Sequence, residues 1–164
     1  MISAWFNSLI KPSETFTNEL PNASLGKGTL NFLIAGLIIG VAYFLAYSLF
    51  FGLTGFSSLG VLIIIVAPIA LIISSLIGTA LYFIISKLVG GKGSYTGLYY
   101  LTSLYAVPII VLALIPIVNI ISGLYSIFLS IRAVQISQSL SFWRSVAVIL
   151  LPVVLLVFVV IIGI

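Results

Sequence analysis

The sequence contains no cysteine, no histidine and no aspartate, and its only carboxylate side chains are Glu14 and Glu19. Without cysteine the chain forms no disulfide and has no thiolate nucleophile. Zinc and other transition metals bind mainly to cysteine, histidine and carboxylate groups, so no metal site is predicted. Acid–base catalysis usually needs His, Asp or Glu, and both glutamates precede the first long apolar run. The sequence therefore predicts a protein that is not an enzyme and has no cofactor.

Charged residues are also scarce, which excludes a water-soluble fold. Only 5% of the 164 residues are charged and 63% are hydrophobic, whereas soluble domains average about 25% charged and about 45–50% apolar residues. The net charge of +4 comes from six isolated lysines and arginines, and no basic run indicates binding to nucleic acid. Long uncharged apolar segments are typical of membrane-crossing helices. The composition therefore predicts an all-α integral membrane protein.

The apolar segments divide into five predicted transmembrane helices. One crossing takes about 20 apolar residues, so the uncharged stretch from Gly97 to Ile131 is too long for a single one. Pro116 and Asn119 mark the turn between two short spans. We expect a cytoplasmic or interfacial segment, residues 1–28, and a transmembrane domain, residues 29–164. Its spans cover about residues 29–51, 61–89, 98–115, 117–135 and 145–164.

The N-terminal segment has the pattern of a helix that lies on the membrane surface. Ile2, Trp5, Phe6 and Leu9 follow the i, i+3, i+4, i+7 spacing of one helix face, and the segment is too short to cross a bilayer. This face is expected to be buried in the membrane interface as a short amphipathic helix. The alternative is a disordered terminus that contains a few apolar residues.

All the positive charges fall on one face if the chain crosses the membrane five times. In pairs, they precede the first span, follow the second and flank the connection after the fourth: Lys11, Lys27, Lys87, Lys92, Arg132 and Arg144. Cytoplasmic loops carry an excess of lysine and arginine. The pattern predicts a cytoplasmic N-terminus and a C-terminus outside.

The connection after the second span is polar and rich in glycine. Gly90, Gly91 and Gly93 favour turn conformations that bulkier residues resist. A phosphate-binding loop is not predicted, because Gly93 rather than serine or threonine follows Lys92. The residues of the cytoplasmic face that we expect to contact a partner or lipid are Lys87, Lys92, Tyr95, Arg132, Trp143 and Arg144.

Arg132 has two interpretations. A charged side chain at the centre of a membrane helix costs about 2.5–3.5 kcal/mol on insertion scales. The side chain either extends to the interface from the end of its span, or it pairs with Glu14 or Glu19. The second arrangement would hold the N-terminal segment beneath the helix bundle.

Polar side chains inside the spans also have two interpretations. On the fourth span, three serines recur every four residues and form one hydroxyl stripe. Their hydroxyls either bond to backbone carbonyls or a neighbouring helix, or line the path of a solute. The candidate intramembrane polar contacts are Tyr105, Asn119, Ser122, Ser126 and Ser130.

Two further features concern helix packing. Gly36 and Gly40 form a pair of small residues that lets another helix approach closely. Pro68 and Pro108 lie inside predicted spans, where proline kinks a helix or breaks its hydrogen bonding. Interrupted helices of this kind often line transport sites.

Two segments resemble the prokaryotic branch of the Yip (Ypt-interacting protein) domain family: LVGGKGSYTGLYYLTSLYAVP and, after the hairpin at Pro116, GLYSIFLSIRAVQISQSLSFWRSVAVILLP. The N-terminal KPSETFTNEL is similar to the opening common in that branch. The resemblance covers most of the chain and implies a five-span protein of a prokaryotic cell membrane. Eukaryotic relatives are implicated in vesicle traffic and contact small membrane-anchored GTPases, which the resemblance implies as a partner class. It implies no catalytic residues.

Two functional hypotheses follow. The first is a non-enzymatic membrane protein that organises membranes or recruits partners through its basic cytoplasmic face. Its expected partners are membrane lipids, a second copy of the chain or another membrane protein. The second is a small transporter or channel that uses the serine stripe, Asn119 and Tyr105. The absence of carboxylates from the spans disfavours proton coupling.

Overall fold

The described part of the chain is helical throughout. The computed structural model describes residues 2–51 and 58–162, and these contain no strand. The prediction of an all-helical fold is therefore confirmed. In chain order the helices are α1 (Ile2–Ile10), α2 (Pro12–Glu19), a 3-10 turn (Leu20–Asn22), α3 (Leu25–Phe51), α4 (Ser58–Leu88), α5 (Tyr95–Ala113), α6 (Pro116–Gln138) and α7 (Phe142–Ile162).

Four helices of the described residues are long and apolar enough to cross a membrane. Their apolar stretches coincide with the first four predicted spans: Leu25–Leu49, Val61–Leu88, Tyr95–Ala113 and Pro116–Gln138. Three of the four stretches contain a single charged residue each, Lys27, Lys87 or Arg132, and Tyr95–Ala113 contains none. The first four spans of the prediction therefore correspond to α3, α4, α5 and α6.

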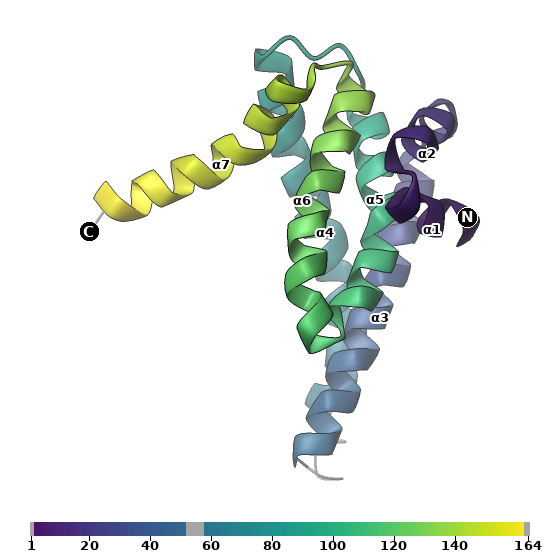
Figure 1. Cartoon of the computed structure of the whole chain (residues 1–164). Coiled ribbons are helices and arrows are strands. Elements are labelled where there is room, and N and C mark those ends of the chain that lie inside the picture. Colours follow the sequence, from purple (N-terminus) through teal and green to yellow (C-terminus); the bar gives the residue numbers. More distant parts are fainter. Residues whose placement is uncertain (1, 52–57, 163–164) are drawn as a thin grey trace.

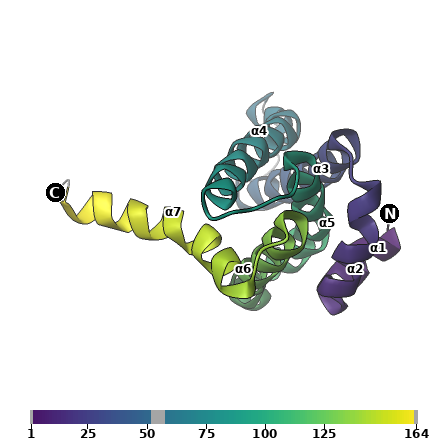
Figure 2. The same cartoon turned by 90° about the horizontal axis from the view of Figure 1, so that it is seen from above.

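The predicted fifth span, residues 145–164, falls on α7 as far as Ile162, and residues 163–164 lie outside the described part. Figures 1 and 2 show that α7 does not run along the other long helices but projects sideways from one end of the bundle. Ser145, Val148 and Ile149 near its start are buried. The contact of α7 with the bundle is thus made by its first turns.

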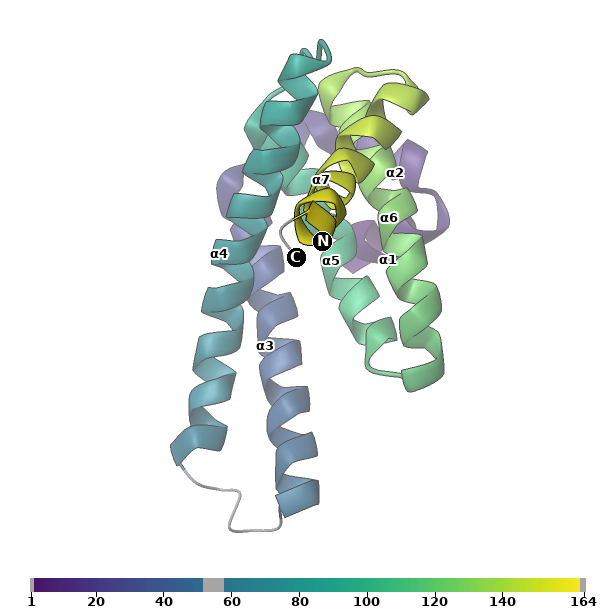
Figure 3. The same ribbon diagram turned by 90° about the vertical axis from the view of Figure 1, so that its left-hand side faces the viewer.

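The four long helices form two antiparallel hairpins of unequal length. Helices α3 and α4 have 27 and 31 residues, whereas α5 and α6 have 19 and 23. At about 1.5 Å per residue the first pair is roughly 12 Å longer than the second. Figures 1 and 3 show that the α5–α6 hairpin ends well before the α3–α4 hairpin. The distal part of the bundle therefore consists of α3 and α4 alone.

The turn between α5 and α6 lies where the sequence predicts it. Helix α5 ends at Ala113 and α6 begins with Pro116, which suits the first turn of a helix because the N–H that proline lacks would have no partner there. The Asn119 side chain donates from Nδ2 to the Ala113 carbonyl at 2.9 Å. Asn119 thus closes the hairpin.

Glycine lets α3 and α4 pack backbone against backbone. A Cβ atom at Gly36 would lie 2.3 Å from the Cα of Pro68, and one at Gly40 would lie 2.9 Å from the Cα of Ile64. Both distances are shorter than any van der Waals contact. The predicted small-residue pair therefore acts within the chain, between consecutive helices, and Pro68 lies at the point of closest approach.

The N-terminal segment is part of the core. Figures 1 and 2 show α1 and α2 folded back beside α5 and α6, and we call residues 2–22 the N-terminal hook. Phe16 is completely buried and packs with Tyr105 at a ring-centroid distance of 6.2 Å. The same cluster contains Leu104 and Leu129. The alternative of a disordered terminus is thereby excluded for these residues.

The predicted apolar face of α1 is present in the structure. Trp5 and Leu9 pack against the core cluster, and Ile2 and Phe6, which are 65% and 60% exposed, line the same apolar groove as these two residues. Another face of the helix carries Ala4 and Ser8, one turn apart and both buried, and small side chains allow a close approach to α5. Burial of the apolar face in the membrane interface stays a prediction.

Gly36→Ala is expected to destabilise the protein by about 1–3 kcal/mol, the usual cost of forcing extra volume into a packed contact. The new methyl group would meet the backbone of Pro68, which cannot move as a side chain can. Gly78→Ala is the matched control, because a Cβ there has no neighbour within 4 Å. Thermal unfolding in one detergent measures both. Equal midpoints would contradict the α3–α4 contact.

Candidate functional site

A glycine loop joins α4 to α5 and packs on the end of α6. Gly90 has a φ of +93°, a conformation that costs glycine little. A Cβ at Gly93 would lie 1.6 Å from the Ser137 carbonyl oxygen. The loop is tied to α6 by two hydrogen bonds with Gln138, whose carbonyl accepts from the Lys92 N–H at 2.9 Å and whose Nε2 donates to the Ser94 carbonyl at 3.0 Å.

Three cations surround this loop. Lys87 Nζ donates to the carbonyls of Gly91 at 3.2 Å and Gly93 at 2.7 Å. Arg144 Nη1 donates to the Val89 carbonyl at 3.4 Å. Lys92 is exposed and makes no side-chain hydrogen bond among the described residues. The structure thus brings Lys87, Lys92 and Arg144 together, and we call this group the basic cluster.

The two aromatic residues predicted on this face have different surroundings. Trp143, next to Arg144, is exposed and contacts Phe142 edge to face at a centroid distance of 5.5 Å. Tyr95 stacks on Tyr99 at 6.0 Å and donates its hydroxyl to the Leu76 carbonyl at 2.9 Å. Trp143 is therefore available to lipid, whereas Tyr95 links α5 to α4.

Arg132 contacts aromatic rings and an amide rather than the glycine loop. Its guanidinium sits over the rings of Phe128 and Phe142 at 5.3 and 5.6 Å and donates from Nη1 to Gln135 Oε1 at 2.9 Å. Among the described residues it forms no ion pair with Glu14 or Glu19, so the pairing interpretation is not realised. Arg132 is instead stabilised by two aromatic rings and a side-chain amide.

The serines of α6 bond to their own helix. The hydroxyls of Ser122, Ser126 and Ser130 donate to the carbonyls of Asn119, Gly123 and Ser126 at 2.9, 2.7 and 2.8 Å. Ser130 also shares a hydrogen bond of 2.8 Å with Tyr105. These are the local bonds that the first interpretation of the stripe requires.

The hook is held by polar contacts that the sequence analysis did not identify. Trp5 Nε1 donates to Asn31 Oδ1 at 3.0 Å, and Asn31 Nδ2 donates to Ser103 Oγ at 2.9 Å. Tyr100 donates its hydroxyl to Glu19 Oε2 at 2.7 Å. The sequence does contain one indication of the Trp5–Asn31 contact, namely the amide of Asn31 inside an apolar span. A buried amide needs a hydrogen-bond partner, and Asn31 is only 1% exposed. Glu19 thus does what was proposed for Arg132: it fixes the hook to the bundle.

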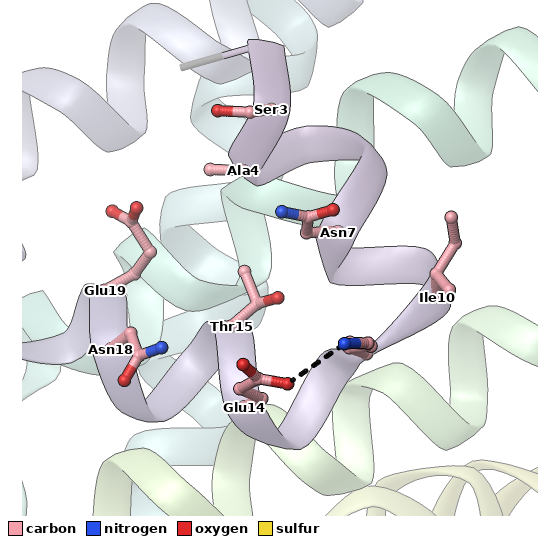
Figure 4. A pocket seen from close by; sticks show the side chains of 9 residues that line it. Ser3, Ala4, Asn7, Ile10, Glu14, Thr15, Asn18 and Glu19 are labelled. Atoms are coloured by element: carbon pink, nitrogen blue, oxygen red, sulfur yellow. Dashed lines mark ion pairs between the residues drawn. The ribbon is translucent and has the colours of Figure 1, made fainter.

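A polar cleft separates the two helices of the hook (Figure 4). Its volume is about 250 Å³. Both carboxylates of the chain line it, together with Lys11, whose Nζ lies 3.7 Å from Glu14 Oε2. No group of three potential metal-ligating side chains occurs within the described residues. The cleft therefore brings both glutamate side chains and Lys11 to one polar site on the hook.

The chain is similar to a known family of proteins. The family model of the Yip1 domain matches residues 6–164, which includes most of the hook as well as the long helices. Neither the curated proteins nor the solved structures contain a match.

Phe16→Ala is expected to release the hook, because truncating a fully buried phenylalanine costs about 3–5 kcal/mol. Backbone amides of residues 2–22 should then exchange hydrogen faster, as measured by mass spectrometry in detergent. Phe6→Ala is the matched control, since Phe6 is largely exposed. Arg132→Ala should also leave exchange in the hook unchanged. If exchange in the hook becomes faster in Arg132→Ala and not in Phe16→Ala, the interpretation in which Arg132 pairs with Glu14 or Glu19 is supported instead.

Proposed function

Since the chain belongs to the Yip1 domain family, we propose that it is a non-enzymatic integral membrane protein that organises membranes or recruits partners through its basic cytoplasmic face. The observation that supports this is the basic cluster, in which Lys87, Lys92 and Arg144 surround one loop. The exposed Trp143 lies beside it. Tryptophan favours the membrane–water boundary, and juxtamembrane lysine and arginine attract anionic lipids and acidic protein surfaces.

The working surface consists of the basic cluster, Trp143 and the adjoining ends of α4, α5, α6 and α7. Its partners would be anionic membrane lipids, a second copy of the chain or another membrane protein, and a small GTPase by family resemblance. Lys87 holds the loop carbonyls in place, so Lys92 and Arg144 are the side chains best placed to contact a partner.

We further propose that α7 is the fifth membrane span, with the N-terminus in the cytoplasm and the C-terminus outside. Helix α7 has 21 residues, which at about 1.5 Å per residue matches the thickness of a hydrocarbon core of about 30 Å. This arrangement requires α7 to turn toward the bundle axis from the sideways direction seen in Figure 1. It leaves every lysine and arginine on the cytoplasmic side.

A topology reporter tests the five-span arrangement. Alkaline phosphatase fused after residue 164 should be active in a bacterial host, because this enzyme matures only outside the cytoplasm. A fluorescent protein fused before residue 1 should be fluorescent, which reports a cytoplasmic N-terminus. An inactive phosphatase at normal expression would instead place the C-terminus in the cytoplasm and leave four spans.

A small transporter or channel is the alternative function. It is favoured by one observation, a cavity of about 180 Å³ between α3, α4 and α5. Hydroxyl-bearing residues from α4 and α5, including Thr79, Tyr82, Thr102 and Tyr105, line this cavity. The accessible lining is mostly apolar, because the Thr102 and Tyr105 hydroxyls bond to the Tyr99 carbonyl and to Ser130. The cavity therefore suits a lipid or another apolar solute better than a polar one.

The partner hypothesis predicts a loss of binding in the double variant Lys92→Ala/Arg144→Ala. Proteins or anionic lipids that co-purify with the wild type from native membranes should fall about tenfold in yield, since two contacts of about 0.7 kcal/mol each sum to one factor of ten. Lys27→Ala, which removes an exposed lysine outside both the basic cluster and the polar cleft, is the matched control. Equal recovery of co-purifying proteins and lipids with the wild type, the double variant and the control would contradict the partner hypothesis. Solute flux in liposomes would then test the transporter function.

A further inference from the structure

The polar cleft of the hook has a composition unlike the rest of the membrane domain. Ser3 and Asn7 of α1 lie on one side and Glu14, Thr15, Asn18 and Glu19 of α2 on the other (Figure 4). The cleft holds one lysine and two carboxylates, so its formal charge is negative, in contrast with the net charge of +4 of the chain.

Several polar groups in the cleft lack a partner. Thr15 is only 8% exposed, it lines the cleft, and its hydroxyl makes no hydrogen bond with any described residue. Glu19 accepts from Tyr100 through Oε2, and its Oε1 has no partner among the same residues. The ion pair of Glu14 with Lys11 is long and largely exposed, so it contributes little. Neither the Thr15 hydroxyl oxygen nor Glu19 Oε1 belongs to the buried atoms without a partner among the described residues, so both are open to the cleft and available to bond to a ligand there.

The opposite side of α1 borders an apolar groove. This groove has a volume of about 310 Å³ and is lined by Trp5, Phe6 and Leu9 of α1, Ile38 of α3, and Pro108 and neighbouring residues of α5. Pro108 is 13 residues beyond the start of α5 at Tyr95, or about 20 Å along the helix. The groove therefore reaches the depth of lipid acyl chains.

An apolar stripe on α1 connects the two cavities. Ile2, Phe6 and Ile10 are spaced four residues apart and are all largely exposed. Ile10 lines the polar cleft, whereas Ile2 and Phe6 line the apolar groove. One amphiphilic molecule can thus place a polar group between α1 and α2 and a hydrocarbon chain over α1 into the groove.

We propose that the hook binds a phospholipid with a primary-ammonium headgroup, such as phosphatidylethanolamine. A primary ammonium has three N–H donors and needs acceptors, which Glu14, Glu19 and Thr15 provide. Quaternary ammonium groups are bound by aromatic rings, and none of the residues that line the cleft is aromatic. Lys11 is placed to bind the phosphate. This site is independent of the basic cluster and of the partner proposed for it.

Trp5 offers a direct measurement, because the chain has only two tryptophans and Trp143→Phe leaves Trp5 as the sole emitter. The Trp143→Phe protein is placed in phosphatidylcholine nanodiscs that contain an acyl-brominated phospholipid, since bromine quenches tryptophan on contact. Brominated phosphatidylethanolamine should quench Trp5 at about a tenfold lower mole fraction than brominated phosphatidylcholine or phosphatidylglycerol, the factor for one charge-assisted hydrogen bond.

Variants separate a binding role from a structural one. In the Trp143→Phe background, Glu14→Gln should remove most of the tenfold preference, and Thr15→Val should reduce it about fivefold, the value of one neutral hydrogen bond. Thr17→Val is the matched control, because the Thr17 hydroxyl bonds to the Ser13 carbonyl outside the cleft. Thr15→Val should leave the melting temperature unchanged, since its hydroxyl has no partner within the described residues.

Three results would overturn the proposal. Equal quenching by all three brominated lipids would show that the groove does not select a headgroup. A lower melting temperature in Thr15→Val with an unchanged lipid preference would give Thr15 a structural role only. Loss of the preference on adding soluble phosphoethanolamine in stoichiometric amounts would assign the cleft to a free small molecule rather than to a lipid.

Discussion

The constraint on which the structure depends is that polar groups inside a membrane must find partners within the protein. Among the described residues, many of these bonds are local. Serine hydroxyls of α4 and α6 return to the carbonyls of their own helices, and Asn119 closes the α5–α6 turn. Other bonds run between helices. Asn31 bonds to Trp5 and Ser103 from two other helices, and Tyr100 bonds to Glu19. These two sets of bonds join the hook to the spans.

Small residues also hold the helices together. In lipid no hydrophobic force drives helices into contact, so close packing at small side chains takes its place. Gly36 and Gly40 bring α3 against α4, and Gly93 lets the loop lie on the end of α6. Ala4 and Ser8 repeat the same device on α1. Close packing at these points is what orients the basic cluster on one side of the loop and the polar cleft within the hook.

The sequence alone predicts much of the fold and less of the candidate sites. Hydropathy locates α3 to α6, and Pro116 with Asn119 locates the tight turn between α5 and α6. Both features can be read from neighbouring residues in the sequence. The docking of Phe16 was not predictable, since it lies in a polar octapeptide and its partner Tyr105 is far away in the sequence. The direction of α7 was not predictable either, because it depends on the packing of the first turns of α7 against the bundle. The hydrophobicity of α7 is uniform and indicates no direction.

The unequal hairpins give the molecule a tapered outline. Near the glycine loop the cross-section includes the hook, four long helices and the start of α7, whereas the far end consists of α3 and α4 only (Figure 3). Such a body displaces more lipid from the leaflet next to the hook than from the other. A bilayer would accommodate this shape most easily where it is curved, with the leaflet next to the hook on the convex side.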